Sequence, residues 1–295
     1  MNKATTLVLV FFFYFLAFWL GFMVSYLLVD KIGMYFNLFI ATSISTVVIY
    51  IISLFLKNAS IYDPYWSIGP FFLIFVYYFL YNQQISFGFH HLIVLIPLIF
   101  WGIRLTGNWI SEFTGLNYED WRYIKIKGMF KNRVLKEIVV FFGIMFVPTV
   151  IVYFATIPLF TSFLANGTAP ILFYILGAII ILGGTVIEFV ADDQMQTFRE
   201  QKLGTNINSG LWKYSRHPNY LGEILVWIGV FVASLNNFKV INLVGPVVIL
   251  GLFLFISIPM NEKRYLTRYE TYLDYKKSTS MLIPLPKKNK NLLNQ

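Results

Sequence analysis

Long apolar runs recur along almost the whole chain, and most of them are long enough to cross a membrane. A transmembrane helix needs about 20 mostly apolar residues to span roughly 30 Å of hydrocarbon. The third and seventh runs are short, and we expect neighbouring helices to shelter them. The sequence therefore predicts an all-α fold, a polytopic transmembrane helical bundle. About eight spans are predicted, at residues 7–29, 35–56, 67–81, 91–110, 138–160, 171–191, 221–235 and 241–259.

The composition of the chain supports this class and excludes others. Of its 295 residues, 58% are hydrophobic and 13% are charged, whereas a soluble domain is about half apolar and about a quarter charged. The chain has no cysteine, which excludes disulfides and thiolate metal ligands. Its three histidines are His90, His91 and His217, and no third ligand accompanies the first two. We therefore predict no metal site.

The distribution of positive charge predicts the orientation in the membrane. If both ends of the chain lie in the cytoplasm, all 23 lysines and arginines except Lys31 and Lys239 fall on the cytoplasmic side. The positive-inside rule favours that arrangement, so we predict cytoplasmic N- and C-termini. The net charge of +9 is then explained by topology and by contact with anionic lipid, without nucleic acid.

The most polar stretch, LWKYSRHPNYLGE at residues 211–223, comes directly before an apolar run. Pro218 suits the first turn of a helix, with Ser215 or His217 at the cap. A helix N-terminus carries unpaired N–H groups and a partial positive charge, which favour a phosphate or a carboxylate. Two cations precede this helix start and add to that preference. They are Lys213 and Arg216.

Polar residues continue beyond the start of this helix. Asn219 and Glu223 lie four residues apart on one face, with Tyr220 adjacent. An ionisable group one turn inside a span is costly unless it faces a partner or a polar cavity. The alternative is that the segment only anchors the helix at the membrane interface, with Glu223 paired to Arg216. Such an anchor does not require both Asn219 and Glu223. We therefore expect a binding cleft at the cytoplasmic end of the helix.

A second polar group is predicted where the helix of 171–191 continues outward. In EFVADDQMQTFREQK, residues 188–202, the spacing places Glu188, Asp192 and Arg199 on one helix face. Asp192 is suited to ribose or amide hydrogen bonds and Arg199 to a phosphate. Taken alone, a helix end that reaches water, with Asp192 and Arg199 simply paired, is the better interpretation.

Two ionisable residues lie near the inner ends of other spans. Asp63 follows the second span, and Arg104 lies within the fourth. They either pair with each other or line a cavity, and a single structural salt bridge explains them equally well.

Four tyrosines near the C-terminus are spaced by four, three and three residues. This spacing predicts one stripe of an amphipathic helix on the membrane surface. Glu262 and Arg264 lie at the root of that helix, where they are placed to close over a site. The tyrosines are Tyr265, Tyr269, Tyr272 and Tyr275.

Several of these segments resemble a known family. DDQMQTF and SGLWKYSRHPNYLGEILVWIGV, together with DPYWSIGP, WGIRL and EDWRY, resemble the steroid 5-alpha-reductase-like integral membrane enzymes, in particular their uncharacterised bacterial branch. The likeness covers about residues 60–286. An R-H-P-x-Y-x-G element is shared with isoprenylcysteine and phospholipid methyltransferases, which bind S-adenosylmethionine, and with sterol reductases, which use NADPH.

The resemblance implies that NADPH lies in the cytoplasmic half of a reductase-like membrane domain, residues 35–286. An additional N-terminal helix in 1–34 precedes that domain, and a basic tail at 287–295 follows it. Asp192, Arg199, Arg216, Asn219 and Glu223 match family positions that contact the cofactor. The C-terminal EKRY segment adds Arg264 and Tyr265, and the helix start adds Lys213 and His217.

The resemblance also implies a catalytic group. Steroid reductases place a Glu and a Tyr near Asp63 and Trp101 to polarise the substrate carbonyl. This sequence keeps neither residue type there, which argues against a steroid as the substrate. Asp63 or a tyrosine then takes that role, so the predicted catalytic residues are Asp63, Tyr220 and Glu223.

The expected function is NADPH-dependent reduction of an activated, enone-like C=C bond in a lipid or isoprenoid-like substrate. The alternative is a methyltransferase that uses S-adenosylmethionine in the same cleft, and a non-enzymatic membrane protein is the third possibility. Four cations near the cleft favour a phosphate-bearing cofactor. They are Arg199, Lys202, Lys213 and Arg216. The expected partners are the bilayer and a hydrophobic small molecule, and the expected location is a bacterial inner membrane.

Overall fold

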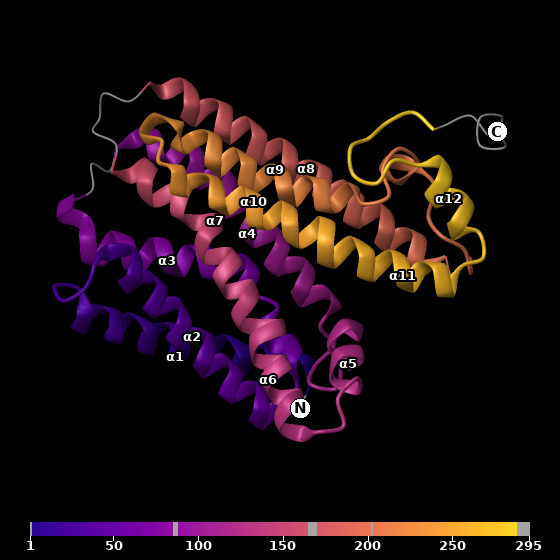
Figure 1. Cartoon of the computed structure of the whole chain (residues 1–295), viewed down its shortest axis with the longest axis horizontal. Coiled ribbons are helices and arrows are strands. Elements are labelled where there is room, and N and C mark those ends of the chain that lie inside the picture. Colours follow the sequence, from indigo (N-terminus) through magenta and orange to yellow (C-terminus); the bar gives the residue numbers. More distant parts are fainter. Residues whose placement is uncertain (1, 85–87, 165–169, 202, 288–295) are drawn as a thin grey trace.

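The computed structural model of the protein describes residues 2–84, 88–164, 170–201 and 203–287. The regular elements in these ranges are helices, apart from one bridge between Ser215 and Ser280 (Figure 1). The α-helices are α1 (Lys3–Leu28), α2 (Met34–Leu56), α3 (Tyr65–Tyr81), α4 (Phe89–Glu112), α5 (Trp121–Gly128), α6 (Arg133–Val139), α7 (Val147–Phe163), α8 (Ile171–Glu200), α9 (Pro218–Ala233), α10 (Val244–Leu252), α11 (Ile258–Arg268) and α12 (Tyr272–Ser278). Shorter 3-10 helices include η1 (Ala59–Tyr62) and η4 (Gly210–Lys213), and η3 (Val140–Phe146) and η7 (Phe253–Ser257) are π-helical.

The predicted transmembrane bundle is confirmed. Seven helical segments in the described ranges are long and apolar enough to cross a membrane. The remaining predicted span, the third, is α3, which is apolar but only 17 residues long. It packs against α1, α2, α4 and α7, so its neighbours shelter it as expected. The last predicted span is longer than expected, because α10, η7 and α11 follow one another up to Arg268.

The additional first helix is an integral part of the bundle. A Cβ on Gly21 of α1 would lie 2.3 Å from the Ser45 hydroxyl oxygen and 2.5 Å from the backbone oxygen of Ala41, both on α2. Ser45 also donates a hydrogen bond to the backbone oxygen of Ala17 at 3.1 Å. Such close approach needs a residue without a side chain at this crossing. The helix α1 therefore packs on α2 along a seam of small residues.

A second glycine seam joins α8 to α9. A Cβ on Gly184 would lie 2.6 Å from the backbone oxygen of Gly222, and a Cβ on Gly177 would lie 2.6 Å from that of Gly229. Gly184 belongs to the LGGT segment of α8, and close helix packing is what small residues permit there. The same seam brings Glu188 against α9, since a Cβ on Gly222 would lie 2.6 Å from the Cβ of Glu188.

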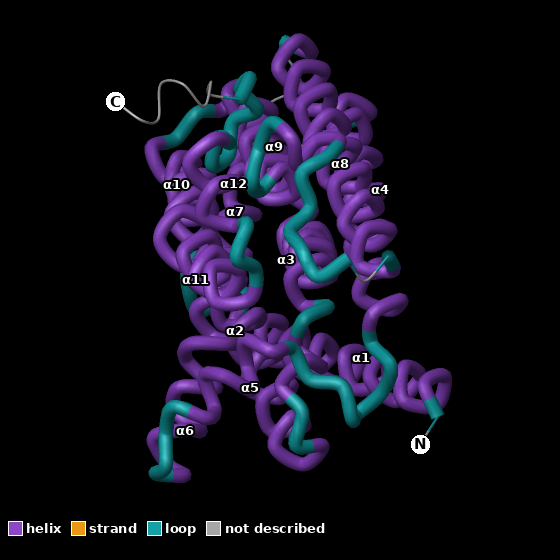
Figure 2. Tube along the Cα trace, turned by 90° about the vertical axis from the view of Figure 1, so that its right-hand side faces the viewer, coloured by secondary structure: helices purple, strands orange, loops and turns teal. Residues whose placement is uncertain are grey.

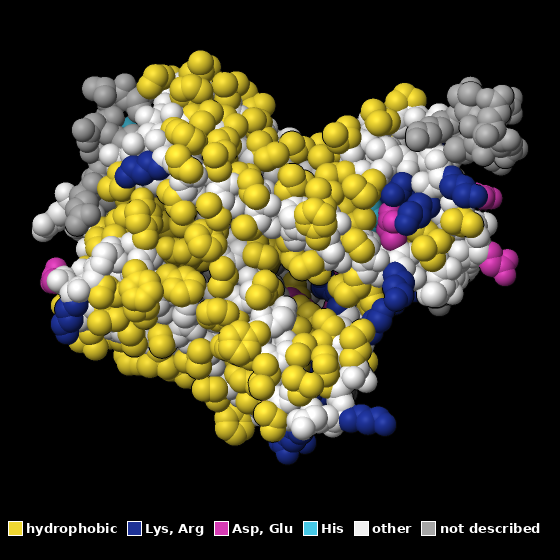
Figure 3. Space-filling model, viewed as in Figure 1, with side chains coloured by type: hydrophobic (Ala, Val, Ile, Leu, Met, Phe, Trp, Pro, Cys, Tyr) yellow, Lys and Arg dark blue, Asp and Glu magenta, His cyan; other side chains and the backbone are white. Residues whose placement is uncertain are grey.

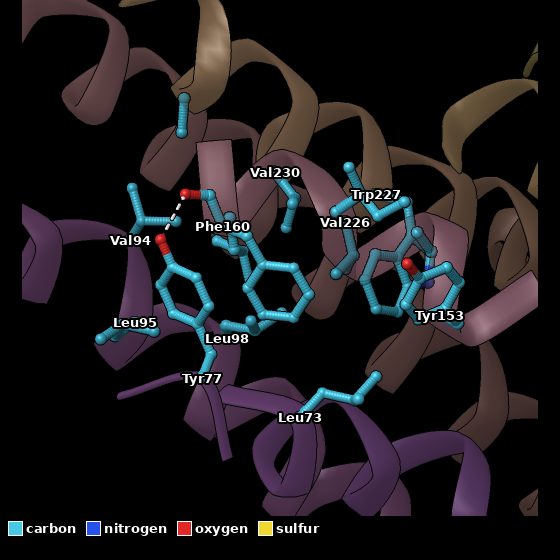
Figure 4. Close-up of a cluster of buried hydrophobic side chains, with 14 of the residues drawn as sticks. Leu73, Tyr77, Val94, Leu95, Leu98, Tyr153, Phe160, Val226, Trp227 and Val230 are labelled. Atoms are coloured by element: carbon cyan, nitrogen blue, oxygen red, sulfur yellow. Dashed lines mark hydrogen bonds between the residues drawn. The ribbon is translucent and has the colours of Figure 1, made fainter. Parts of the chain in front are cut away.

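Below this seam, apolar side chains fill the middle of the bundle (Figure 4). Tyr77 of α3 donates a hydrogen bond to the backbone oxygen of Phe160 of α7 at 3.1 Å, which satisfies a buried phenol inside the apolar cluster. The buried face of α9 contributes Val226, Trp227 and Val230 to the same cluster. The polar residues described below lie at one end of this core.

Both described ends of the chain lie at the same end of the bundle. Lys3 donates a hydrogen bond to the backbone oxygen of Ser111, at the end of α4. Ser280 accepts a hydrogen bond from the backbone N–H of Arg216, just before α9 begins. Figure 2 looks at this end, where α5, α6 and α12 lie. A common side for the two ends agrees with the predicted topology. The predicted tail at 287–295 lies outside the described residues apart from Lys287.

Candidate functional site

A buried carboxyl group on α9 is held by three tryptophans. Glu223, which is 3% exposed, accepts hydrogen bonds from the indole Nε1 atoms of Trp66 at 2.7 Å, Trp101 at 2.9 Å and Trp227 at 2.8 Å. Indole N–H groups only donate, so the carboxyl group is the acceptor in all three bonds. Glu223 thereby ties α3 and α4 to its own helix, α9. The interfacial alternative, in which Glu223 pairs with Arg216, is wrong.

Next to this carboxyl group, Arg104 of α4 binds two acidic residues of α8. Its Nη2 atom lies 3.2 Å from Glu188 Oε1 and 2.9 Å from Asp192 Oδ2. Asn108, one turn further along α4, donates to the same Asp192 oxygen at 3.1 Å. The predicted face of α8 is therefore confirmed for Glu188 and Asp192. Arg104 does not pair with Asp63.

Several polar atoms around Arg104 lack a hydrogen-bond partner from the protein. Arg104 Nε and Nη1, Glu188 Oε2 and Asn219 Oδ1 are buried atoms without a hydrogen-bond partner among the described residues, although the Glu188 side chain also interacts with Glu223, and the Asn219 side chain with Asp192. An unpaired buried polar group costs about 1–3 kcal/mol, so four together are expected where a ligand supplies the partners. Arg104 offers donors, whereas Glu188 and Asn219 offer acceptors. In Figure 3, a few acidic and basic side chains are visible in a hollow among the apolar side chains near the middle of this face.

The predicted clamp at the start of α9 binds the C-terminal part of the chain. α9 begins at Pro218, as expected, with His217 at the cap position. Arg216 Nε lies 2.8 Å from Glu262 Oε1, and its Nη1 donates to the backbone oxygens of Lys276 at 2.9 Å and Thr279 at 2.5 Å. Glu262 also contacts His217 Nε2 at 3.3 Å and Lys276 Nζ at 2.7 Å.

Burial lowers the pKa of His217 from its ordinary value, which favours the neutral ring. Arg216 and His217 are therefore placed at the predicted helix start, but their side chains bind Glu262 of α11, and Arg216 also binds backbone oxygens at the end of α12. Their predicted contact with a cofactor stays a prediction.

Tyr220 lies in the first turn of α9 and contacts residues of η7 and α11. Its ring stacks on His217 with centroids 5.4 Å apart, and it contacts Phe253 of η7 at 4.6 Å. The side-chain amide of Asn261 donates to its hydroxyl oxygen. Arg122, Asp120 and Asp192 all lie near enough to interact electrostatically with Tyr220.

Asp63 belongs to a separate polar group with the short helix α5. Tyr123 donates a hydrogen bond to Asp63 Oδ1 at 2.5 Å, and Arg122 binds Asp120 at 2.8 Å beside them. Burial raises the pKa of Asp63 from 3.8 to about 7, although Arg122 and Tyr123 act in the opposite direction. A carboxyl group with such a pKa exchanges its proton near neutral pH.

The remaining predicted cofactor residues lie at the exposed edge of this end. Arg199 is exposed and lies 3.5 Å from Glu112, not against Asp192. Lys213 is exposed and its Nζ lies 5.4 Å from the ring centroid of Tyr214. Arg264 lies 4.1 Å above the ring of Trp121 on α5. Lys202 is outside the described residues.

The tyrosine stripe is not one helix. The helix α11 ends at Arg268, and α12 begins at Tyr272, so a turn separates Tyr265 from the last two tyrosines. The four rings still contact one another, because the turn folds α12 back onto α11: Tyr265 lies 6.0 Å from Tyr269 and 5.3 Å from Tyr272, and Tyr272 lies 5.7 Å from Tyr275.

Sequence reasoning missed most of the partners of Glu223. In the sequence, Trp66, Trp101 and Trp227 are apolar residues in or next to three predicted spans. Asn108, a partner of Asp192, is a polar residue near a helix end. A buried indole N–H normally finds an acceptor. The available signal was therefore the presence of three tryptophans in or next to apolar runs, together with one acidic residue inside a predicted span. Within the described ranges, no group of three or more His, Asp or Glu side chains is arranged to hold a metal ion.

Comparison with known proteins places the chain in a family. The model of a family described as "Protein of unknown function (DUF1295)" matches residues 49–279, a range that includes the residues of the site described above. The chain belongs to this family. DUF1295 proteins are associated with steroid 5-alpha-reductase-like proteins. An uncharacterized protein of Schizosaccharomyces pombe is 26% identical over 265 residues, covering 79% of this chain and 74% of the yeast protein. No solved structure matches the chain.

Proposed function

We propose that this DUF1295 protein is a membrane-embedded reductase that uses NADPH to reduce an activated C=C bond in a lipid. The observation that carries the proposal is the set of unpaired buried atoms on Arg104, Glu188 and Asn219. It lies at the polar end of an integral, multi-pass membrane protein. A lipid can reach such a site from the bilayer, while a charged cofactor reaches it from the basic end, which we assign to the cytoplasmic side of a bacterial inner membrane.

The unpaired atoms fit the carboxamide of a nicotinamide ring. That group has one carbonyl acceptor and an NH2 with two donors. Arg104 has two free donors, Nε and Nη1, and Glu188 Oε2 and Asn219 Oδ1 are two free acceptors. The two sets are complementary in number and in kind. The phosphates of the cofactor would meet Arg199 and Lys213, whose side chains are exposed at the same end.

NADPH, when bound, supplies the hydride that adds to the β-carbon of the double bond and is released as NADP+. The protein has to stabilise the negative charge that moves onto the conjugated carbonyl oxygen and deliver one proton to the α-carbon. Tyr220 is the proposed proton donor. Asn261 donates a hydrogen bond to its hydroxyl oxygen, so the phenolic O–H is left to donate to the substrate. Glu223 orients the floor of the site through its three indoles.

The charge balance of the site favours a second candidate, the transfer of a methyl group from S-adenosylmethionine. Arg104 is surrounded by three carboxyl groups, on Glu188, Asp192 and Glu223. An excess of buried acid suits the sulfonium and ammonium charges of S-adenosylmethionine, and Arg104 suits its carboxylate. Phosphates are not needed in this case.

A thermal-shift titration of the purified protein distinguishes the two candidates. NADPH, NADH and S-adenosylmethionine are tested side by side. A ligand that binds only the folded protein adds about 2.7 kcal/mol of stability at 100 times its dissociation constant, which is readily detected. Stabilisation by NADPH supports the reductase, and stabilisation by S-adenosylmethionine alone replaces it with the methyltransferase. No response to any of the three refutes both proposals.

A pair of asparagine variants tests whether the response comes from this site. Asn219→Ala removes a buried acceptor of the site, so the ligand-induced shift, measured from the melting temperature of the same variant without ligand, should be lost. Asn236→Ala is the matched control, because Asn236 has an equally unpaired buried oxygen but lies beyond the other end of α9. Equal responses in both variants would place the ligand elsewhere.

A further inference from the structure

Outside the site, the strongest feature is the basic hairpin, which we define as α5, the following turn and the start of α6, residues 121–136. Six of its residues are basic and none is acidic. It follows α4 at the end of the bundle that carries both described chain ends (Figures 1 and 2). The basic residues are Arg122, Lys125, Lys127, Lys131, Arg133 and Lys136.

Most of this charge is not neutralised by the protein. Arg122 binds Asp120, and Lys127 binds Glu119 at 2.5 Å. The other four cations form no ion pair within the described ranges, and three of them are exposed. The exposed ones are Lys125, Lys131 and Arg133.

Large apolar side chains lie between these cations. Ile124 is 56% exposed, Met129 is 62% and Val134 is 69%. The hairpin leads directly into the span Arg133–Phe163, so it lies where the bilayer ends. Figure 3 shows basic side chains beside hydrophobic ones at the lower corner of the molecule, where α5 and α6 are drawn in Figure 1. Apolar side chains between cations are typical of a surface that inserts among lipid headgroups.

We propose that the basic hairpin is a docking surface for anionic phospholipid headgroups. Lys125, Lys131 and Arg133 bind the headgroup phosphates, and Met129 and Val134 enter the acyl boundary. The partner follows from charge complementarity, since the hairpin carries only positive charge, and from its position at the end of a span. Each lysine or arginine near an anionic membrane surface contributes about a fivefold gain in binding.

The docking surface shares the helix α5 with the polar group around Asp63. Tyr123 of α5 holds Asp63, and Trp121 at the start of α5 lies under Arg264 of α11. The helix α5 therefore connects the N-terminal half of the bundle to its C-terminal half. Headgroups bound to the hairpin fix α5 in that position, so the composition of the leaflet acts on the residues around Asp63.

A single spin label tests the proposal on the full-length protein. The chain has no cysteine, so Met129→Cys gives one labelling site within the hairpin. The labelled protein is placed in nanodiscs of phosphatidylcholine, of phosphatidylcholine with phosphatidylglycerol, and of phosphatidylcholine with inorganic phosphate in the buffer. The spectrum reports the ratio of immobilised, docked hairpin to mobile hairpin. A docked label is also shielded from a water-soluble relaxation agent.

Two charge variants with equal loss of charge complete the design. Lys125→Gln with Lys131→Gln should lower the docked-to-mobile ratio in phosphatidylglycerol about 30-fold, at about fivefold for each charge. Lys31→Gln with Lys239→Gln removes the same charge from exposed positions outside the hairpin and should leave the ratio unchanged.

The proposal is supported if phosphatidylglycerol immobilises the label and only the hairpin variant loses the effect. It is overturned if the label is equally immobile in phosphatidylcholine alone, or if the hairpin variant behaves as the parent does. An equal effect from inorganic phosphate also overturns it, because the cations would then bind a free anion and not the membrane.

Discussion

The three indoles around Glu223 lead to a prediction whose sign depends on which oxygen each of them binds. Oε1 accepts from the two indoles of Trp66 and Trp227, whereas Oε2 accepts from one indole, that of Trp101. Glu223→Gln keeps one oxygen and replaces the other with an NH2 group. The amide should place its oxygen where two donors meet, which leaves the NH2 group facing the N–H of Trp101. A donor then meets a donor in a buried site.

The size of the effect follows from that geometry. In the parent, Trp101→Phe removes one hydrogen bond to a charged acceptor, worth about 1.5–3 kcal/mol, and adds the cost of a smaller ring. Together with Glu223→Gln, the same change removes an unsatisfied buried donor, which returns about 1–3 kcal/mol. The ring-size cost is the same in both backgrounds and cancels in the double-mutant cycle. The coupling free energy should therefore be about 2.5–6 kcal/mol.

Trp227 supplies the matched control. Trp227→Phe removes a donor that the amide oxygen still accepts, so its coupling to Glu223→Gln should be only about 1 kcal/mol, the difference between a charged and a neutral hydrogen bond. Equilibrium unfolding in mixed detergent and SDS micelles, followed by far-UV circular dichroism, measures the four free energies of each cycle. Equal coupling for Trp101 and Trp227 would refute the assignment of two indoles to one oxygen.

Three further predictions concern stability. Burial raises the pKa of Asp63 from 3.8 to about 7. Between these pH values the folded protein keeps a proton on Asp63 that the unfolded chain loses. The contribution of this protonated carboxyl group to stability is therefore complete below pH 3.8 and is lost as the pH rises to about 7. Asp63→Asn should flatten that decline in unfolding free energy measured across pH. Gly184→Ala should cost about 1–3 kcal/mol, because its Cβ would lie 2.6 Å from a backbone oxygen of α9, whereas Gly183→Ala meets open space and should be neutral or stabilising in the same assay. Glu262→Gln should lower the free energy of unfolding by about 3 kcal/mol, because Arg216 loses its buried charged partner. Faster trypsin cleavage at the lysines and arginines between residues 263 and 277 should then report that this segment has detached from Arg216.

The sequence was sufficient to predict which side chains share a helix face, but not which helix they meet. Glu188 and Asp192 are four residues apart, so any helix places them on one side. Their partner is Arg104, more than 80 residues away on α4. That pairing depends on how α4, α8 and α9 are set against one another, and the glycine seam at Gly184 fixes part of that setting. A periodic pattern shows which residues share a helix face, but not how far one helix is shifted along its neighbour. From the sequence, Asp63 was therefore an equally reasonable partner for Arg104.

The start of α9 shows how a correct local prediction can leave the partner open. Pro218 and the unpaired N–H groups after it predict a place that favours negative charge. Such a place disfavours Arg216 and a protonated His217 unless an anion lies nearby. Glu262, 45 residues further along the chain, is that anion, and it lies within 3.3 Å of both side chains. The two side chains expected to bind an anion beside this helix start therefore bind a carboxylate of the protein itself. A phosphate can meet Arg216 there only by competing with Glu262, and Glu262→Gln should for that reason strengthen phosphate binding wherever it does not unfold the C-terminal segment.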